Sequence, residues 1–487
     1  MSTIVPEEAG HLIAPVDPGS NTGERADTCA DDRASDGEGP RSLEGKALAT
    51  GGAVLAGAMV IANGGNYLLN VFLGRWLTPA EFADANLIVT LMLLVTAVAV
   101  SLQLIAARFA GIHVVSGDSD ATAALSAWLE KRATVVGVVI AVVLGAGAGF
   151  WSDLFNSASP WPFVILGLGM PFYLVQAVGR GVLQGHLTFA PLAATFVVEM
   201  LVRVGIGVSL VAAGLGVEGA SIGLTSSFVA VWLHVRILSG RKPAAPMSPS
   251  AKKALAHYAG PVAVLLFGQI VVNNGDVLIA KRFLEPETAG VYAAIALVGR
   301  AVFFLSWSVA TTLFPAAAQR EKMGEETNSL LYAGLGVVAT MGVGFVLGAR
   351  FLGGTVLGRV FGPEYAGVSS PLAWYAFATS LFAMANLIVS HHLSMGRQRE
   401  SWVLVAGAGF QTVLLFIGRS SIDSLITAQV IAMTVLLAAV ALSHAVGLRR
   451  SGRSTRPTNS QDPHSPTLSA TSAPTPAMAG TEPVIKG

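Results

Sequence analysis

An arginine, Arg300, stands in the middle of a long apolar stretch of this 487-residue sequence. A cation at that depth in a membrane costs about 3 kcal/mol or more unless protein or water surrounds it. No acidic residue lies one helical turn away from Arg300 on the same segment. Because guanidinium binds phosphate through paired hydrogen bonds, Arg300 predicts contact with an anionic ligand. The alternative is an ion pair with Asp276 or Glu199 on another segment.

Two other apolar segments each carry a stripe of amide and carboxylate side chains. Spacings of three, four and seven residues place such side chains on one face of a helix. One interpretation is hydrogen bonding between packed helices. The recurrence of the stripe favours the other interpretation, a polar cavity that binds a substrate. The residues are Asn63, Asn66 and Asn70 in the first segment, and Gln269, Asn273 and Asp276 in the second; Asn274, next to Asn273, is a further candidate for substrate binding.

The remaining charged residues within apolar segments form a second group of candidates. Glu199 and Arg203 are four residues apart, which predicts an internal ion pair. The alternative is that Glu199 and Arg203, together with Asp276, couple transport to an ion gradient. Arg108 and Arg180 are expected at cytoplasmic helix ends, where they either anchor to lipid headgroups or form a basic mouth for an anionic substrate.

Several familiar motifs fail on their context. The spacing Gly214-x-Gly216-x-x-Gly219 matches a dinucleotide-binding loop, but it lies between two apolar segments with no strand before it. Residues 39–46 resemble a phosphate loop with one residue too many, and Ala47 replaces the required Ser or Thr. Cys29 is the single cysteine, which excludes an internal disulfide. We therefore predict no enzyme activity, no cofactor and no metal site.

The composition is that of an integral membrane protein. Hydrophobic residues make up 53% of the chain and charged residues only 12%, against roughly 25% in soluble proteins. A net charge of +1 gives no indication of nucleic-acid binding. Windows of about 20 apolar residues predict twelve membrane spans in an all-α fold. Their ranges are 48–74, 84–107, 133–152, 161–183, 188–213, 217–238, 259–281, 288–314, 329–349, 370–393, 401–418 and 422–447.

The spans fall into two groups of six. We expect a disordered tail at 1–46, a six-helix bundle at 47–238, a basic linker at 239–257, a second bundle at 258–447 and a disordered tail at 448–487. With the N-terminus inside, the inner segments carry nineteen Lys and Arg residues and the outer loops six. The bias predicts that both termini are cytoplasmic. The six outer residues are Arg75, Lys281, Arg282, Arg350, Arg359 and Arg419.

A short repeat supports this division. Shifting the chain by 207 residues places Arg75-Trp-Leu-Thr-Pro79 on Arg282-Phe-Leu-Glu-Pro286. Each copy ends the first predicted helix of its half. Six spans in each half leave the two copies in the same orientation, so the repeat is parallel, and transporters built from such repeats place the substrate between the halves.

With these motifs in place, the chain resembles the polysaccharide-biosynthesis flippases of the multidrug/oligosaccharidyl-lipid/polysaccharide exporter superfamily. One departure is Glu81-Phe82-Ala83-Asp84, where the family usually has a Tyr-Gly-like pair. Besides the two helix-ending motifs, the matching segments are Leu183-Gln184-Gly185, Gly214-Leu-Gly216-Val-Glu-Gly219-Ala, Ala289-Gly290-Val-Tyr292, Leu313-Phe314-Pro315 and Phe361-Gly362-Pro-Glu-Tyr365.

The resemblance implies two bundles around a central cavity in a bacterial cytoplasmic membrane. It implies movement of a polyprenyl-pyrophosphate-linked oligosaccharide to the outer leaflet by alternating access, with Arg300 on the pyrophosphate and the amide stripes on the sugar. Membrane lipid, a polysaccharide polymerase and glycosyltransferases are the expected partners. Two alternatives stay open: a multidrug or small-molecule antiporter of the same superfamily, and a non-transporting scaffold for cell-envelope enzymes.

Overall fold

The computed structural model describes residues 40–239, 246–304, 306, 309, 328–394 and 399–454. The chain forms two compact units, Met1–Thr50 and Gly51–Gly487. Of the first unit, only the beginning of helix α1 is described. We call residues 51–239 of the second unit the N-half and residues 246–454 the C-half.

The N-half is helical throughout its described residues. Short turns separate its helices, and one of them is a π-helical turn, η1. Gly214 within η1 has a φ angle of +90°, and Gly216 directly after it has a φ angle of +51°. Because glycine has no Cβ, it adopts these angles without strain and reverses the chain there. The elements are α1 (Pro40–Trp76), α2 (Pro79–Val115), α3 (Ser119–Ala146), α4 (Ala148–Leu154), α5 (Trp161–Gly185), α6 (Phe189–Leu210), η1 (Val211–Leu215) and α7 (Gly216–Ser239).

The described part of the C-half is helical as well. Its elements are α8 (Pro249–Phe283), α9 (Pro286–Gly299), α11 (Asn328–Val360), the 3-10 turn η2 (Pro363–Tyr365), α12 (Ser369–Ser394), α13 (Arg399–Ile417) and α14 (Ile422–Ser454). Residues 301–304 continue in helical conformation after Arg300, which ends α9.

Each of the twelve predicted spans overlaps a helix in the described residues. Nine helical segments there are long and apolar enough to cross a membrane, or ten if the bent pair α3 and α4 counts as one span. One of the nine, Phe189–Leu238, contains both α6 and α7, which reverse at Gly214 and pack against each other. Helix α13 contributes a shorter apolar segment, Trp402–Ile417. The prediction of an all-helical membrane protein is confirmed.

The predicted boundaries need three corrections. Helix α1 begins at Pro40, inside the predicted tail, and α14 continues to Ser454. Helix α8 begins at Pro249, inside the predicted linker, because Ser248 caps the backbone N–H of Ala251 and proline suits the first helical position. Residues 1–39, 240–245 and 455–487 of the predicted tails and linker lie outside the described residues, as does the predicted Leu313-Phe314-Pro315 motif.

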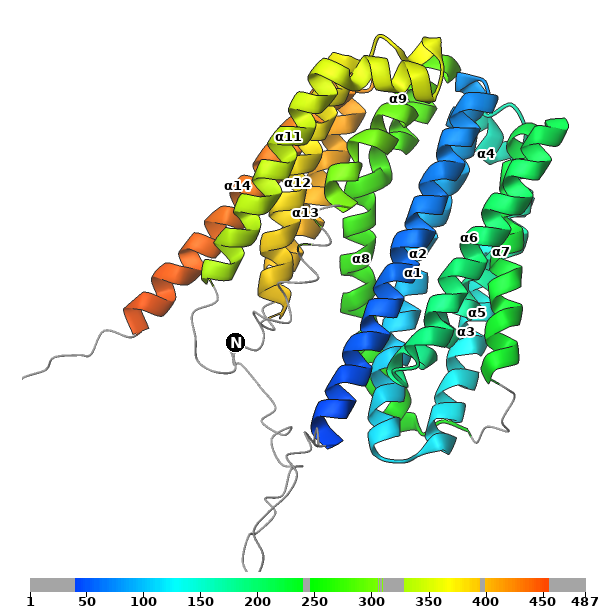
Figure 1. The fold of residues 1–487 in the computed structure, drawn as a ribbon, viewed down its shortest axis with the longest axis vertical. Coiled ribbons are helices and arrows are strands. Elements are labelled where there is room, and N and C mark those ends of the chain that lie inside the picture. The colour runs from blue at the N-terminus through cyan, green and yellow to red at the C-terminus, as the bar shows by residue number, and fades with distance from the viewer. Residues whose placement is uncertain are drawn as a thin grey trace, which may run out of the picture. The chain divides into compact units, whose positions relative to one another are not determined.

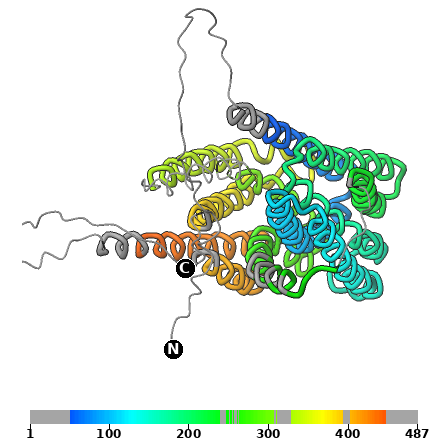
Figure 2. Tube along the Cα trace, turned by 90° about the horizontal axis from the view of Figure 1, so that it is seen from below, coloured from blue at the N-terminus to red at the C-terminus, as the bar shows by residue number. Residues whose placement is uncertain are grey.

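The two halves pack mostly within themselves. In the N-half, α5 packs against α2, α3 and α7; in the C-half, α12 packs against α11 and α14, and α13 against α8 and α14. Both views show α11, α12 and α14 grouped apart from α3, α5, α6 and α7 (Figures 1 and 2). Helix α2 joins the halves, because it packs against α8 and α9.

The repeat found in the sequence has the same backbone in both halves. Thr78 precedes α2 with φ −61° and ψ 159°, and Glu285 precedes α9 with φ −57° and ψ 146°. The N–H of Leu77 donates to the Leu73 carbonyl, and the N–H of Leu284 donates to the Ala280 carbonyl, at 2.9 Å each. The leucine of each motif is buried. These matching turns set the directions in which α2 and α9 leave α1 and α8.

A buried ion pair joins the halves where α2 begins and α8 ends. Lys281 Nζ lies 2.7 Å from Asp84 Oδ1, and the two side chains are only 2% and 6% exposed. The loop after α4 surrounds the pair: Lys281 donates to the Asn156 carbonyl at 3.1 Å, and the Ala158 N–H donates to Asp84 Oδ2 at 3.2 Å. We call Asp84, Asn156 and Lys281 the junction cluster.

The bend between α3 and α4 brings that loop to the junction. The two helices meet at 65°. At Gly147, between them, a Cβ would lie 2.6 Å from the Val143 carbonyl oxygen, so only glycine fits the bend. Trp151 Nε1 donates to the same carbonyl at 2.9 Å and holds α4 in place. Asn156 then adopts a φ of +48°, which asparagine tolerates better than most residues.

Close contacts extend the junction on the opposite side of α2. A Cβ at Gly290 would lie 1.9 Å from the Pro79 carbonyl oxygen, so the beginnings of α2 and α9 touch backbone to backbone. Phe82 packs against the rings of Phe361 and Tyr365, at centroid distances of 5.8 and 6.5 Å. Burial, and to a lesser extent Glu364, raise the pKa of Tyr365 to about 12. This end of the interface between the halves is closed.

Candidate functional site

The N-half holds one carboxylate between two guanidinium groups. Arg180 Nη2 lies 2.7 Å from Glu199 Oε2, and Arg203 Nη2 forms an ion pair with Glu199 Oε1. Arg180 also donates to the hydroxyl and the carbonyl of Thr195, at 2.9 and 3.0 Å. Arg203 Nη1 donates to Asn66 Oδ1 at 3.1 Å and thereby joins α6 to α1. Two cations and one anion leave this cluster with a charge of +1.

A cavity of about 210 Å³ lies beside this cluster, and we call it the N-half cavity. Residues from α1, α2, α5 and α6 line it. Its lining combines amide and charged side chains with the rings of Tyr173 and Phe196. The guanidinium carbon of Arg180 lies 4.3 Å from the centroid of the Phe196 ring. The lining residues are Met59, Ala62, Asn63, Asn66, Thr96, Ala99, Val100, Gln103, Tyr173, Gln176, Ala177, Arg180, Phe196 and Glu199. A polar space with an excess positive charge can accept an anionic, hydroxyl-rich group.

The C-half holds a second polar cluster, which is internally satisfied. Arg300 Nη2 donates to Asp276 Oδ1 at 2.7 Å, Nη1 to Asn274 Oδ1 at 3.1 Å, and Nε to the Tyr375 hydroxyl at 3.0 Å. The hydroxyls of Tyr292 and Tyr375 both donate to Asp276 Oδ2, at 2.9 and 2.7 Å. Asp276 is fully buried, and its charge balances that of Arg300.

The alternative that the sequence left open, an ion pair between Arg300 and Asp276, is therefore present. Asp276 lies on α8, whereas Arg300 follows α9, so the pairing is invisible to spacing along one helix. Contact between Arg300 and a phosphate stays untested; each of the three guanidinium nitrogens already donates to a protein group. A phosphate approaching the N-half cavity meets an excess positive charge instead.

Arg180 also departs from its predicted place. It was expected at a cytoplasmic helix end, but α5 continues to Gly185, and Arg180 is 6% exposed and turned toward Thr195 and Glu199. Arg108 is exposed, but α2 also continues beyond it, for seven residues to Val115. Its role at a substrate entrance stays a prediction.

Among the described residues, the contacts of the two amide stripes are separate. Asn63 and Asn66 line the N-half cavity, whereas the Asn70 side chain donates to the Asn66 carbonyl at 2.9 Å. In the C-half, Gln269 donates to Asn386 Oδ1 at 3.0 Å, and Asn273 is half-buried on α8. Much of the C-half stripe therefore joins helices to each other, as the packing interpretation expects.

Loss of Arg300 is expected to lower stability before it affects substrate binding. The variant Arg300→Met leaves Asp276 buried without a cation, which costs about 3 kcal/mol of unfolding free energy. The double variant Arg300→Met/Asp276→Asn should recover part of that loss, because no uncompensated charge remains. Thermal unfolding of the detergent-solubilised proteins measures both effects. Unchanged stability of Arg300→Met, together with loss of transport, would return Arg300 to the substrate site.

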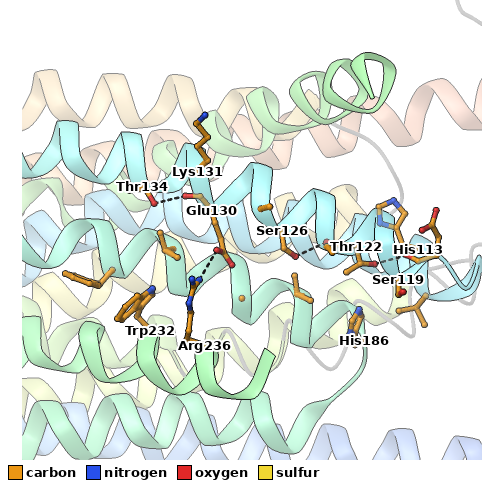
Figure 3. A pocket seen from close by; sticks show the side chains of 18 of the residues that line it. His113, Ser119, Thr122, Ser126, Glu130, Lys131, Thr134, His186, Trp232 and Arg236 are labelled. Carbon is orange, nitrogen blue, oxygen red and sulfur yellow. Dashed lines mark hydrogen bonds and ion pairs between the residues drawn. The ribbon is translucent and has the colours of Figure 1, made fainter. Parts of the chain in front are cut away.

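A larger groove of about 1210 Å³ lies on the surface of the N-half, along α3, α5 and α7 (Figure 3). Arg236 of α7 and Glu130 of α3 point toward each other across it, with Arg236 Nη1 3.3 Å from Glu130 Oε2 (Figure 3). The hydroxyls of Thr122, Ser126 and Thr134 donate to carbonyls one turn back on or next to α3. Lys131 and Asp118 balance the remaining charge, so the groove has no preference for one sign of ligand.

Sequence reasoning missed Gln176 and the junction cluster. Gln176 carries no charge, so it does not belong to the ionisable residues that mark candidate sites in apolar segments; its position four residues before Arg180 on α5 is the signal that could have indicated it. Lys281 was counted among the outer-loop cations. Asp84 was noted only as a departure from the family pattern, and nothing in the sequence joined it to a residue 197 positions away.

Comparisons with known proteins agree with this architecture. The sequence matches the family described as "Polysaccharide biosynthesis protein" over residues 72–370. No curated protein sequence matches the chain. Among solved structures, the lipid II flippase MurJ in an inward closed conformation has a TM-score of 0.68 at 12% identity, covering 81% of this chain and 87% of that one.

Two further transporter structures are also similar. An inward-facing multidrug resistance MATE family transporter of the MOP superfamily has a TM-score of 0.67 at 12% identity, with 78% of this chain and 94% of that chain covered. The second is a MOP superfamily transporter from Pyrococcus furiosus, which is described by the reverse polarity of its binding pocket. It has a TM-score of 0.55 at 14% identity, with 80% of this chain and 94% of that chain covered. At these identities the likeness shows the fold alone. The chain belongs to the polysaccharide biosynthesis protein family and is a multi-pass integral membrane protein with the fold of the MOP-superfamily transporters.

Proposed function

We propose that this protein is a flippase that carries a polyprenyl-pyrophosphate-linked oligosaccharide across a bacterial cytoplasmic membrane. The observation that carries the proposal is the N-half cavity, where Arg180 and Arg203 share the single carboxylate of Glu199. A membrane protein of the polysaccharide biosynthesis family needs to recognise pyrophosphate and sugar hydroxyls together. A polar cavity beside a cluster with a charge of +1 suits both groups.

The fold supports an alternating-access cycle. With both termini in the cytoplasm, the junction cluster lies at the outer end of the helices, so the outer side is closed in this structure. The headgroup enters the N-half cavity from the cytoplasm, and the polyprenyl chain stays in the bilayer. Opening of the outer side requires Asp84 and Lys281 to separate. Release of the headgroup outside completes the transfer.

Glu199 is the stronger candidate for coupling transport to an ion gradient. It lines the N-half cavity, where a proton or cation can reach it, and its ion pairs hold both arginines. Asp276 is fully buried, and both of its oxygens are bonded to Arg300, Tyr292 and Tyr375. Any role of Arg203 in coupling depends on Glu199, because protonation of the Glu199 carboxylate would release the Arg203 guanidinium from its ion pair.

The first test is mass spectrometry of lipid extracts from host cells depleted of this protein. We expect a polyprenyl-pyrophosphate-linked oligosaccharide to accumulate, and re-expression of the wild-type chain to clear it. The mass of the accumulated species identifies the sugar. A host without a second flippase is required, because a redundant transporter would clear the intermediate.

Absence of any accumulated lipid-linked sugar in such a host would contradict the proposal. Increased drug sensitivity of the depleted cells would then favour a multidrug antiporter. Its fold is compatible, although the charge of +1 at the N-half cavity disfavours a cationic drug. A phenotype that follows deletion of residues 1–39 or 455–487, but not substitution within the cavity, would favour a scaffold for cell-envelope enzymes.

A further inference from the structure

We infer that the N-half cavity is a subsite for a single sugar ring that carries an anionic substituent, with the ring hydroxyls bonded to the Gln176 amide and the anion bonded to Arg180. The inference rests on the proposed function and names the part of the headgroup that the cavity selects. It is separable from that function, because a flippase could hold its headgroup elsewhere.

The Gln176 side chain is the first reason. It is 1% exposed and lines the cavity, yet neither its Nε2 nor its Oε1 has a hydrogen-bond partner among the described residues. An unsatisfied buried amide lowers stability, and most buried polar groups in folded proteins are hydrogen-bonded. A donor and an acceptor side by side match two neighbouring hydroxyls of a sugar, since each hydroxyl both donates and accepts.

The Arg180 guanidinium is the second reason. Its Nε and Nη2 hydrogen-bond to Thr195 and Glu199, whereas no described group accepts from its Nη1. Because Arg180 lies four residues after Gln176 on α5, the two side chains stand one helical turn apart at the same cavity. An anion on the sugar can therefore reach Nη1 while the ring contacts the amide.

The size and walls of the cavity limit the ligand. Its volume of about 210 Å³ is below the roughly 300–1,000 Å³ of sites for drug-sized molecules, which favours one ring over an oligosaccharide. Tyr173 and Phe196 provide apolar faces, and the Tyr173 hydroxyl is engaged with Thr96 Oγ1 at 2.7 Å. The walls thus cover the C–H face of a ring, and Gln176, Asn63 and Gln103 supply polar contacts at its edge.

The anion could be the phosphate that links the first sugar to the lipid or the carboxylate of an acidic sugar. Binding to the purified wild-type protein, measured by isothermal titration calorimetry, separates the two. The probes are glucose 1-phosphate, glucuronate, glucose and inorganic phosphate, each up to tens of millimolar. Tighter binding of glucose 1-phosphate identifies the linking phosphate, and tighter binding of glucuronate identifies an acidic sugar. Either must bind more tightly than glucose or phosphate alone.

Gln176→Leu tests the amide directly. The variant should bind the preferred probe roughly tenfold more weakly for each hydrogen bond lost. Its melting temperature should rise, because the substitution removes two unsatisfied buried atoms. Gln429→Leu is the matched control: Gln429 is 4% exposed, also has an unpartnered Oε1, and lies on α14 away from the cavity. That control should keep the affinity of the wild-type protein.

Ala99→Leu provides a second route if Gln176→Leu does not fold, because Ala99 lines the cavity and a larger side chain fills it. Loss of probe binding in this variant supports the subsite. Equal affinity for inorganic phosphate and glucose 1-phosphate would overturn the sugar subsite, as would wild-type binding by both variants or no binding of any probe. Each of these results leaves the lipid-accumulation test of the flippase unaffected, so the two proposals fail separately.

Discussion

The variant Arg180→Gln is expected to abolish clearance of lipid-linked oligosaccharide in depleted cells. Without Arg180, the cluster with Glu199 and Arg203 has no net charge, and no cation remains among the described residues that line the cavity. A hydrogen bond to a charged group contributes up to about 3 kcal/mol, so headgroup affinity should fall roughly 100-fold. Mass spectrometry of lipid extracts measures the result, with protein level as the check on folding.

Two double variants with the same charge separate an effect of position from an effect of charge. Glu199→Gln/Arg203→Gln keeps Arg180 at the cavity, and Glu199→Gln/Arg180→Gln keeps Arg203, which does not line it. Both clusters carry a charge of +1. We expect the first double variant to retain part of the transport and the second to retain none. Equal transport by the two would show that the cavity does not contact the anion through Arg180.

Lys281→Met is expected to produce the largest loss of stability. The substitution leaves Asp84 buried with only the Ala158 N–H as a partner, and breaking a buried ion pair in this way costs about 3–5 kcal/mol. Asp84→Asn should cost a similar amount, because Lys281 would then keep only the Asn156 carbonyl. Thermal unfolding of the wild type, Lys281→Met, Asp84→Asn and the double variant gives a double-mutant cycle, which measures the coupling energy of the two side chains. A double variant as unstable as the sum of the single variants would show that the two side chains are not coupled.

Covalent closure of the junction tests its role in transport. In a Cys29→Ser background, cysteines at positions 84 and 281 can be joined with a reducible bifunctional thiol reagent. We expect the joined protein to stop clearing lipid-linked oligosaccharide and to resume after reduction, because the outer side cannot open. Treatment of each single-cysteine variant is the control for modification alone. Continued transport by the joined protein would make the junction a fixed support and not a gate.

Much of the local structure could be predicted from short stretches of sequence. Thr78 and Glu81 form a capping box around Pro79, with the Thr78 N–H donating to Glu81 Oε2 at 2.9 Å, and this starts α2 where the motif indicates. The repeat of that motif at Glu285 and Pro286 starts α9 with nearly the same backbone angles. Local signals sufficed because an α-helix satisfies its own backbone hydrogen bonds.

The site was harder to predict. The ion pair of Glu199 with Arg203 follows from a spacing of four residues and is present. Three arginines, Arg108, Arg180 and Arg300, could contact an anionic substrate. The sequence favoured Arg300 because no acidic partner lies on the same helix. In the structure, Asp276 on α8 pairs with Arg300. The excess positive charge lies instead where Arg180 of α5 and Arg203 share the Glu199 carboxylate. The role of each of these residues in substrate binding stays a prediction.

Apolar length, charge bias and turn motifs determined that this chain is a helical membrane protein with a repeated beginning to each half, because those properties depend on the bilayer thickness and on nearest neighbours. Tertiary structure alone decided which charges cancel. Asp84 with Lys281, Glu199 with Arg180, and Asp276 with Arg300 each join separate helices. Such pairing depends on how each helix is rotated about its axis and which neighbour it meets, and residue spacing within one helix contains neither quantity.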